Sequence, residues 1–352
     1  MADTPTSTGG IAKLAVPFDF LNAMLRGRRR LIYEGERLAA LKTARDVQEL
    51  AQTLYPREVI GGRLGLERRL REDCIRELAA TAHYLPPVAF DFYVPLLRRF
   101  QVDAIQVLLR LVAGGCEEAA MEQYVPDLPA PLALPTAELI HSTGLEQLCE
   151  RLPREFRSAA RRVLGLTQRA GSAAFIEMAV ERVYWLRATQ ALAGLPPRWR
   201  TECSGPVLSE LRTVRLLAVL RAARNYRIEW AELAPVLPAC HGRLKSEDAR
   251  GISAVQLRTL YEDPSPAHVA EAARPPGGAA AAADLTELEE AGWADTRRLA
   301  NRLYYGKMQG PAVLTSYFYL RRAELKDLAK LVESVHYASR ARKGHGPDSG
   351  IS

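Results

Sequence analysis

The sequence has no long apolar run and no signal-peptide pattern in its first residues, and both absences bear on where in the cell we expect the protein. No stretch of its 352 residues approaches the roughly 20 consecutive apolar residues that a membrane-spanning helix needs. The first ten residues, MADTPTSTGG, lack the basic start and apolar centre of a secretory signal peptide. We therefore expect a cytoplasmic protein, peripheral on the cytoplasmic face of a membrane, which it contacts only through a partner.

Cysteine is also scarce. The five cysteines are odd in number and far apart, and no two form a Cys-x-x-Cys pair, the spacing typical of zinc and redox sites. They are Cys74, Cys116, Cys149, Cys203 and Cys240. We expect buried, reduced thiols.

Catalytic motifs are missing as well. The six histidines show no His-Glu-x-x-His or His-x-His spacing, which argues against a metal site. The glycine-rich segment 61–65 follows no strand and precedes no Lys-Ser or Lys-Thr pair, so it predicts a turn before a helix rather than a phosphate loop. We expect no metal, no cofactor and no catalytic residue. An active site assembled only by the tertiary fold stays open as an alternative.

What the sequence does contain is a composition typical of helices. The chain is 48% hydrophobic and 25% charged, and alanine, leucine, arginine and glutamate, all good helix formers, dominate it. We therefore predict an all-α protein. Its net charge of +7, from 48 basic and 41 acidic residues, is interspersed. That pattern favours a solvated arginine-rich surface over a nucleic-acid groove.

One helical pattern occurs three times. It covers 97–115 and returns from Leu211 and from Leu320. The segments VLLR, AVLR and KLVE end at Arg110, Arg221 and Glu333, at spacings of 111 and 112 residues. In the first copy, apolar residues recur every three or four positions, which is the core-facing stripe of an amphipathic helix.

A second helical pattern precedes each copy and repeats at nearly the same spacing. Its copies start at Leu66, Ile176 and Leu288, 110 and 112 residues apart. The predicted connectors between the two patterns contain helix-breaking residues: Pro86–Pro87, Gly205–Pro206 and Gly310–Pro311.

These repeats predict three helical units that lie side by side around an axis or in an arc. The units cover 12–115, 116–227 and 228–338, and 339–352 is a disordered tail. Further short helices are expected at 43–54, 136–148, 228–237 and 253–261. The alanine-rich tract 273–284 reads as a surface loop, and the aromatic segment 316–320 as core.

The densest charge in the chain is RGRRR. Its arginines, Arg26, Arg28, Arg29 and Arg30, form a candidate contact patch for an acidic partner. Alternatively, these arginines form the solvent-exposed face of an amphipathic helix, with Phe20, Met24, Leu31 and Ile32 turned inward. Both readings stay open from the sequence.

Several of these segments resemble the C subunit of A/V-type ATPases, called subunit d in the vacuolar enzyme. The family's opening helix resembles Phe18, Asn22, Ala23, Arg26 and Leu31, with phenylalanine in place of its tyrosine. FQVDAIQVLLR resembles a second family helix and keeps Asp103 and Arg110. LPACHGRL resembles a family turn through Gly242, Arg243 and Leu244. The closing segment from Gly310 resembles the final helix pair, with Glu333 where the family usually has arginine.

The resemblance implies three similar helical units around a pseudo-threefold axis, in the shape of a funnel. It also implies a non-catalytic central-stalk adapter of a rotary ATPase. Such an adapter links the membrane rotor ring to the central-stalk subunits and transmits torque for ATP-coupled proton or sodium transport. No nucleic acid is expected as a partner. The competing readings are a helical repeat scaffold for unrelated protein partners and a helical enzyme.

Overall fold

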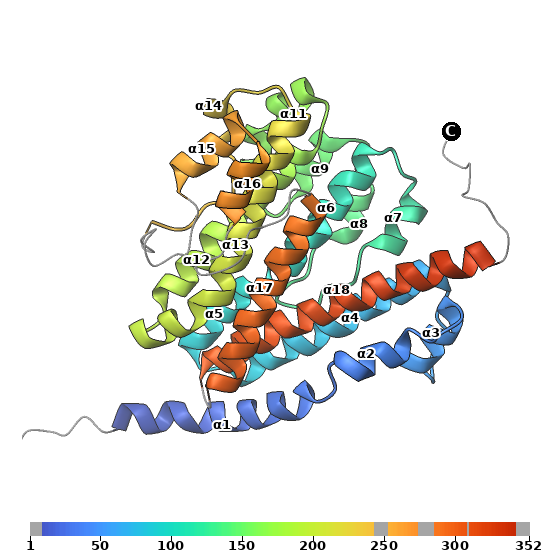
Figure 1. Cartoon of the computed structure of the whole chain (residues 1–352), viewed down its shortest axis with the longest axis vertical. Coiled ribbons are helices and arrows are strands. Elements are labelled where there is room, and N and C mark those ends of the chain that lie inside the picture. The colour runs from blue at the N-terminus through green and yellow to red at the C-terminus, as the bar shows by residue number, and fades with distance from the viewer. Residues whose placement is uncertain (1–8, 243–252, 274–284, 308–309, 343–352) are drawn as a thin grey trace, which may run out of the picture.

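The computed structural model describes residues 9–242, 253–273, 285–307 and 310–342. Every regular element in these ranges is a helix (Figure 1), which confirms the predicted all-α class. The elements are α1 (Gly9–Arg29), α2 (Gly35–Leu41), α3 (Val47–Leu54), α4 (Gly62–Thr81), η1 (Ala82–Tyr84), α5 (Pro87–Leu97), α6 (Arg99–Ala113), α7 (Glu118–Tyr124), α8 (Thr136–Ile140), α9 (Leu145–Arg151), α10 (Arg154–Arg162), α11 (Leu164–Ala170), α12 (Ala174–Gly194), α13 (Pro197–Asn225), α14 (Trp230–Leu233), α15 (Ala254–Glu262), α16 (Pro266–Ala273), α17 (Leu285–Gly306) and α18 (Pro311–Arg342).

Three pairs of helices form the centre of the molecule. The first helices are α4, α12 and α17, and the second helices are α5 with α6, α13, and α18. The repeated segments of the sequence lie on these helices. Each second helix begins at a proline, Pro87, Pro197 or Pro311. Proline fits this position because the first N–H of a helix has no intrahelical partner.

The pairs pack in a closed order. Helix α4 contacts α18, α18 contacts α17, α17 contacts α13, α13 contacts α12, and α12 contacts α5 and α6. Figure 1 shows α12, α13 and α17 side by side, with α18 and α4 running together across the lower part of the view and rising toward the right. The circle closes between α4 and α5, where the Thr81 hydroxyl donates to the Tyr93 hydroxyl at 3.1 Å. The boundaries of the three units and their threefold relation stay predictions.

The predicted connector at Gly205–Pro206 is wrong. Helix α13 is continuous through this dipeptide, and Pro206 is buried inside it. Its packing offsets the backbone hydrogen bond that a proline removes. In the first pair, Pro95 also lies inside a helix, but α5 ends two residues later and α6 begins at Arg99.

Two of the predicted short helices are also incorrect in extent. The segment 136–148 contains two helices, because α8 ends at Ile140 and α9 begins at Leu145. Within 228–237, only Trp230–Leu233 is helical. The helix expected at 43–54 is confirmed from Val47 to Leu54, where α3 lies, and residues 43–46 precede it outside the helix. The helix expected at 253–261 is confirmed as α15, where Ser253 and Gln256 form a capping box that satisfies two backbone N–H groups.

The predicted tail begins too early. Helix α18 continues to Arg342, so 339–342 is helical, and its basic last turn suits the negative C-terminal end of the helix dipole. Residues 343–352 lie outside the described residues, as do 274–284 of the predicted alanine-rich loop.

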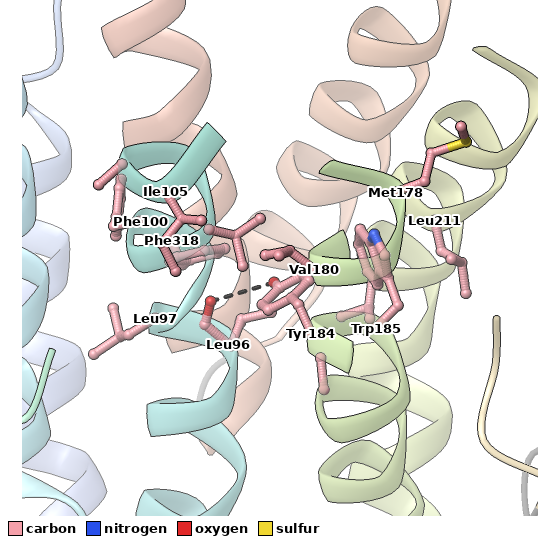
Figure 2. Close-up of a cluster of buried hydrophobic side chains, with 14 of the residues drawn as sticks. Leu96, Leu97, Phe100, Ile105, Met178, Val180, Tyr184, Trp185, Leu211 and Phe318 are labelled. Atoms are coloured by element: carbon pink, nitrogen blue, oxygen red, sulfur yellow. Dashed lines mark hydrogen bonds between the residues drawn. The ribbon is translucent and has the colours of Figure 1, made fainter. Parts of the chain in front are cut away.

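One hydrophobic core joins residues from all three predicted units. Phe100 of α6, Tyr184 of α12, Leu211 of α13 and Phe318 of α18 belong to it. Figure 2 shows these side chains together, with the Tyr184 hydroxyl donating to the carbonyl oxygen of Leu96 at 3.3 Å. Because the units share this core, they form one body and have no separate interiors.

A second cluster of buried hydrophobic residues fixes α18 to α4. Leu50 of α3, Leu66 of α4 and Val332 of α18 are members of it and are fully buried. The aromatic segment 316–320 belongs to the main core and is buried throughout, as predicted. These contacts hold α18 from its first turns to beyond its middle.

The buried face of α1 differs from the prediction. Its stripe is Phe18, Leu21 and Leu25, which are 3% exposed or less, whereas Phe20 is 58% and Leu31 65% exposed. Phe20 lies off the i, i+3, i+7 stripe, and Leu31 follows the end of α1 at Arg29. Of the other two residues predicted to point inward, Ile32 is buried and Met24 packs partly against the core.

The cysteine prediction is right for three of five residues. All five are free, and Cys74, Cys149 and Cys203 are buried. Burial raises the pKa of each of these three thiols to about 12, so they stay protonated near neutral pH. Cys116 is exposed and Cys240 only partly buried, and both lie in segments between helices.

Candidate functional site

All three helix pairs line one cavity, which we call the central cavity. It has a volume of about 570 Å³ and receives side chains from α4, α6, α12, α13, α17 and α18. Its open end lies where α6 and α13 end and α12 and α17 begin, since Arg110, Ala174, Asn225 and Glu289 line it there. The side chain of Arg110 is 61% exposed, whereas residues nearer the opposite ends of these helices are buried.

Charged residues form the deep end of the central cavity. Arg99, Glu210 and Arg322 occupy matching positions under the spacings of 111 and 112 residues found in the sequence, and each is at most 8% exposed. The Arg322 guanidinium donates to Glu210 at 2.8 Å. Arg99 donates at 2.8 Å to a fourth buried residue, Glu181 of α12. Two buried guanidinium groups therefore meet two buried carboxylates, and these charges compensate. Arg99 also pairs with the more exposed Asp103 at 2.8 Å.

The two carboxylates experience different electrostatic surroundings. Burial would raise the pKa of Glu210, but Arg322 and Arg99 outweigh it and hold that pKa below its usual range. Burial raises the pKa of Glu181 despite the nearby Arg99. Glu181 also accepts hydrogen bonds from the Trp185 indole at 2.9 Å and the Gln106 amide at 3.0 Å. These two donors complete the hydrogen bonding of the buried Glu181 carboxylate, which the guanidinium of Arg99 alone does not satisfy.

Trp293 of α17 takes the position that Glu181 has in α12, under the same repeat spacing. The guanidinium of Arg322 lies 5.0 Å and the ammonium of Lys326 lies 5.1 Å from its ring centre. The face of the indole attracts cations, so it replaces the carboxylate of the matching site in α12. This substitution keeps the deep end free of an additional buried acid.

Ion pairs at the rim connect neighbouring helix pairs. Arg110 of α6 donates to Glu177 of α12 at 2.7 Å. The matching residues Arg221 of α13 and Glu289 of α17 are 3.5 Å apart. Both contacts join the second helix of one pair to the first helix of the next pair along the chain. The same type of ion pair therefore occurs twice, at positions related by the repeat spacing.

The matching contact between α18 and α4 is built differently, and its residues do not line the central cavity. The matching positions are Glu333 of α18 and Glu67 of α4, and two carboxylates there would repel each other. Arg63, one helical turn before Glu67, reaches both: its Nη1 lies 2.9 Å from Glu67 and 3.7 Å from Glu333. Arg63 thus supplies a positive charge where α18 carries Glu333.

Comparison with known proteins identifies the family from nearly the whole chain. The family model described as ATP synthase (C/AC39) subunit matches residues 21–343. The chain belongs to this family. The family is a subunit of V-type and A-type ATPases, so the resemblance noted in the sequence is confirmed. A search of curated proteins found no match.

The arginines predicted to contact a partner lie on the last turns of α1 and just beyond it. Arg26 donates to the Lys307 carbonyl oxygen at 3.3 Å, and Arg29 is buried and lies 2.6 Å from Glu34. Arg28 is 4.0 Å from Glu77, with its side chain 33% exposed. Arg30 is exposed. Much of the cluster therefore fixes α1 to the rest of the subunit, and Arg28 and Arg30 are its more accessible members.

The charged residues of the central cavity were missed by motif reasoning because they form no local pattern. A signal was present in the sequence: the repeat spacing relates Arg99, Glu210 and Arg322, and also Glu67, Glu177 and Glu289. Among the described residues, no cluster of three or more His, Cys, Asp and Glu side chains could hold a metal ion. No helix in those ranges is both long and apolar enough to cross a bilayer.

Proposed function

We propose that this subunit is a non-catalytic adapter in the central stalk of a rotary ATPase. In that role it would link the membrane rotor ring to the central shaft and transmit torque for ATP-coupled proton or sodium transport. The observation that supports the proposal best is the central cavity, which all three helix pairs line and which buried ion pairs close at one end. Such a cavity can hold the end of a shaft on the axis of the helix bundle.

The mechanical demand on an adapter is stiffness. Each elementary charge that crosses the membrane releases about 2.3 kcal/mol per 100 mV, and an adapter that deformed easily would dissipate that energy. Helices packed at interior density resist deformation. The rim ion pairs from Arg110 to Glu177 and from Arg221 to Glu289 join successive helix pairs, so a torque applied to one pair would pass to its neighbours.

We assign the shaft to the open end of the central cavity and the rotor ring to the opposite end. Helix α1 crosses that opposite end: Phe18 packs on Trp199 at the start of α13, with ring centres 5.7 Å apart. Beside it, Phe20, Tyr84 and Val88 are 58%, 45% and 44% exposed. We name these three residues the closed-end patch. An apolar surface of this kind suits a protein partner, and Arg28 and Arg30 on the same segment would add contacts to acidic loops.

The test is a pull-down of the tagged subunit from detergent-solubilised membranes, followed by mass spectrometry. We expect ring and central-stalk subunits to co-purify. Val214→Trp would fill the central cavity and remove the shaft subunits while the ring stays bound. Phe20→Glu would have the opposite effect. Val255→Trp and Tyr337→Glu alter exposed residues elsewhere and serve as matched controls.

Recovery of neither ring nor shaft subunits by the unmodified chain would contradict the proposal and favour a scaffold for other partners. Loss of both by Val214→Trp, with normal thermal unfolding, would contradict the assignment of the two ends. The proposal also places the subunit in the cytoplasm, peripheral on the cytoplasmic face of the membrane. Reversing the charges of Arg28 and Arg30 without weakening ring binding would exclude these arginines from the ring contact.

A further inference from the structure

Much of the net positive charge of the chain is concentrated in one segment. Residues 151–187 contain eight arginines and three glutamates and no lysine or aspartate, against a net charge of +7 for the whole chain. Glu177 and Glu181 line the central cavity. The third, Glu155, lies 2.5 Å from Arg98 and also pairs with Arg187. The outer side of this segment is therefore strongly basic.

A groove lies in this basic surface, between α10, α11, α12 and the residues from Glu232 to Val236. Its volume is about 630 Å³. Val163, Leu166, Val183 and Leu186 are among the side chains that form its apolar walls. Arg162, Arg169 and Arg182 line the same groove, and we name it the arginine groove. It is distinct from the central cavity and shares no lining residue with it.

The positive charges of the arginine groove are only partly balanced by carboxylates in its lining. Among the described residues that line it, Glu232 is the single carboxylate, and it pairs with Arg169. Arg182 donates to the carbonyl oxygen of Leu237 at 2.7 Å, and Arg162 donates to that of Ser158 at 3.2 Å. Partial burial, and then the nearby Arg162, lower the pKa of Arg182. Bringing an anion to this groove would relieve the repulsion between the two guanidinium groups.

We propose that the arginine groove binds a segment of a partner protein in which acidic residues flank an apolar side chain. The apolar walls would accept that side chain, and the arginines would accept the carboxylates, for which the planar guanidinium is well suited. A groove fits an extended or helical peptide segment better than the flat surface of a lipid bilayer. A small inorganic anion would leave the apolar walls in contact with water.

The test uses fluorescence anisotropy with a labelled peptide in which glutamates flank one leucine. We expect the peptide to bind, its all-glutamine counterpart to bind at least about tenfold more weakly, and a version with serine for leucine to lose severalfold. Arg162→Gln should weaken binding of the first peptide about tenfold, which corresponds to about 1.4 kcal/mol. The matched control is Arg161→Gln, since Arg161 pairs with Glu150 and does not line the groove; it should change affinity less than about twofold.

Three results would overturn the proposal. One is equal weakening by Arg161→Gln and Arg162→Gln, because diffuse charge would then explain the binding. Another is equal binding of the glutamine peptide. The third is failure of the glutamate peptide to bind at about 1 mM while vesicles of phosphatidylcholine and phosphatidylserine do bind, which would assign the surface to lipid. Each variant is also checked by thermal unfolding, and both altered arginines lie on the exposed side of α10.

Discussion

Replacing Glu210 with glutamine should destabilise the subunit strongly. Glu210 is 5% exposed, and its partner Arg322 is 7% exposed, so the substitution leaves a buried guanidinium without its carboxylate. Removing one member of a buried ion pair costs about 3–5 kcal/mol. Glutamine has nearly the same volume and can still accept a neutral hydrogen bond, so we expect the lower end, about 3 kcal/mol.

The assay is urea unfolding followed by far-UV circular dichroism. At constant slope, the loss appears as a lower midpoint, and in a thermal scan it corresponds to about 4 °C for a chain of this length. The matched control is Glu290→Gln. Glu290 also forms an ion pair, with Lys330 at 2.6 Å, but both side chains are more than half exposed, so we expect a much smaller loss than for Glu210→Gln.

A double variant separates charge from packing. Arg322→Met added to Glu210→Gln removes the orphaned cation, so the combined loss should be smaller than the sum of the two single losses by at least about 1 kcal/mol. A loss below about 1 kcal/mol for Glu210→Gln alone, or strict additivity in the double variant, would show that this ion pair does not fix the deep end of the central cavity.

Three further predictions concern the ion pairs of Arg63, one helix contact and pH. Arg63→Ala should cost about 1 kcal/mol in urea unfolding, because it removes the cation that Glu67 and Glu333 share and leaves Glu67 with the longer contact to Arg71 at 3.6 Å. Adding Glu333→Arg should restore most of that loss; no recovery would refute the role of Arg63. Gly292→Ala should destabilise by about 1–3 kcal/mol, because an added Cβ would lie 2.3 Å from the Thr213 side chain. Gly27→Ala, in open space within α1, should instead gain up to about 1 kcal/mol. Equal effects at the two glycines would exclude close packing as the cause. Finally, the folded-state pKa of Glu210 is lowered, so its stabilising contribution is present above the ordinary carboxylate pKa and is lost as pH falls through the lowered value. The stability difference between the unmodified chain and Glu210→Gln should therefore be full at neutral pH and shrink below about pH 4; a difference that grows on acidification would contradict the assignment.

Local sequence patterns predicted the elements with strong periodicity and erred where tertiary packing decides. The buried segment 316–320 and the capped helix after Ser253 were both predictable, because apolar spacing and capping residues act within a few residues. The continuity of α13 through Pro206 was not. A proline signals a break locally, but buried contacts with other helices can hold the chain helical.

The candidate site was predictable only in outline. The arginines within 26–30 were predicted to contact a partner because their charge density is visible in the sequence. The structure shows Arg29 buried against Glu34. Arg63 could not have been chosen in advance. Its role depends on Glu67 and on Glu333, which is 270 residues away in the sequence, and only the packing of α4 against α18 brings these charges together.

The sequence by itself determined the all-α class, the repeat spacing and the resemblance to the ATPase subunit, because helix propensity and amphipathic periodicity are local properties. The tertiary structure decided which charges are buried, that matched positions of three helices meet at one cavity, and how Arg63 completes the contact between α4 and α18. It also revealed the arginine groove, whose walls come from separate helices. Burial and electrostatic compensation depend on neighbours that are distant in the chain, and those neighbours exist only once the helices have packed.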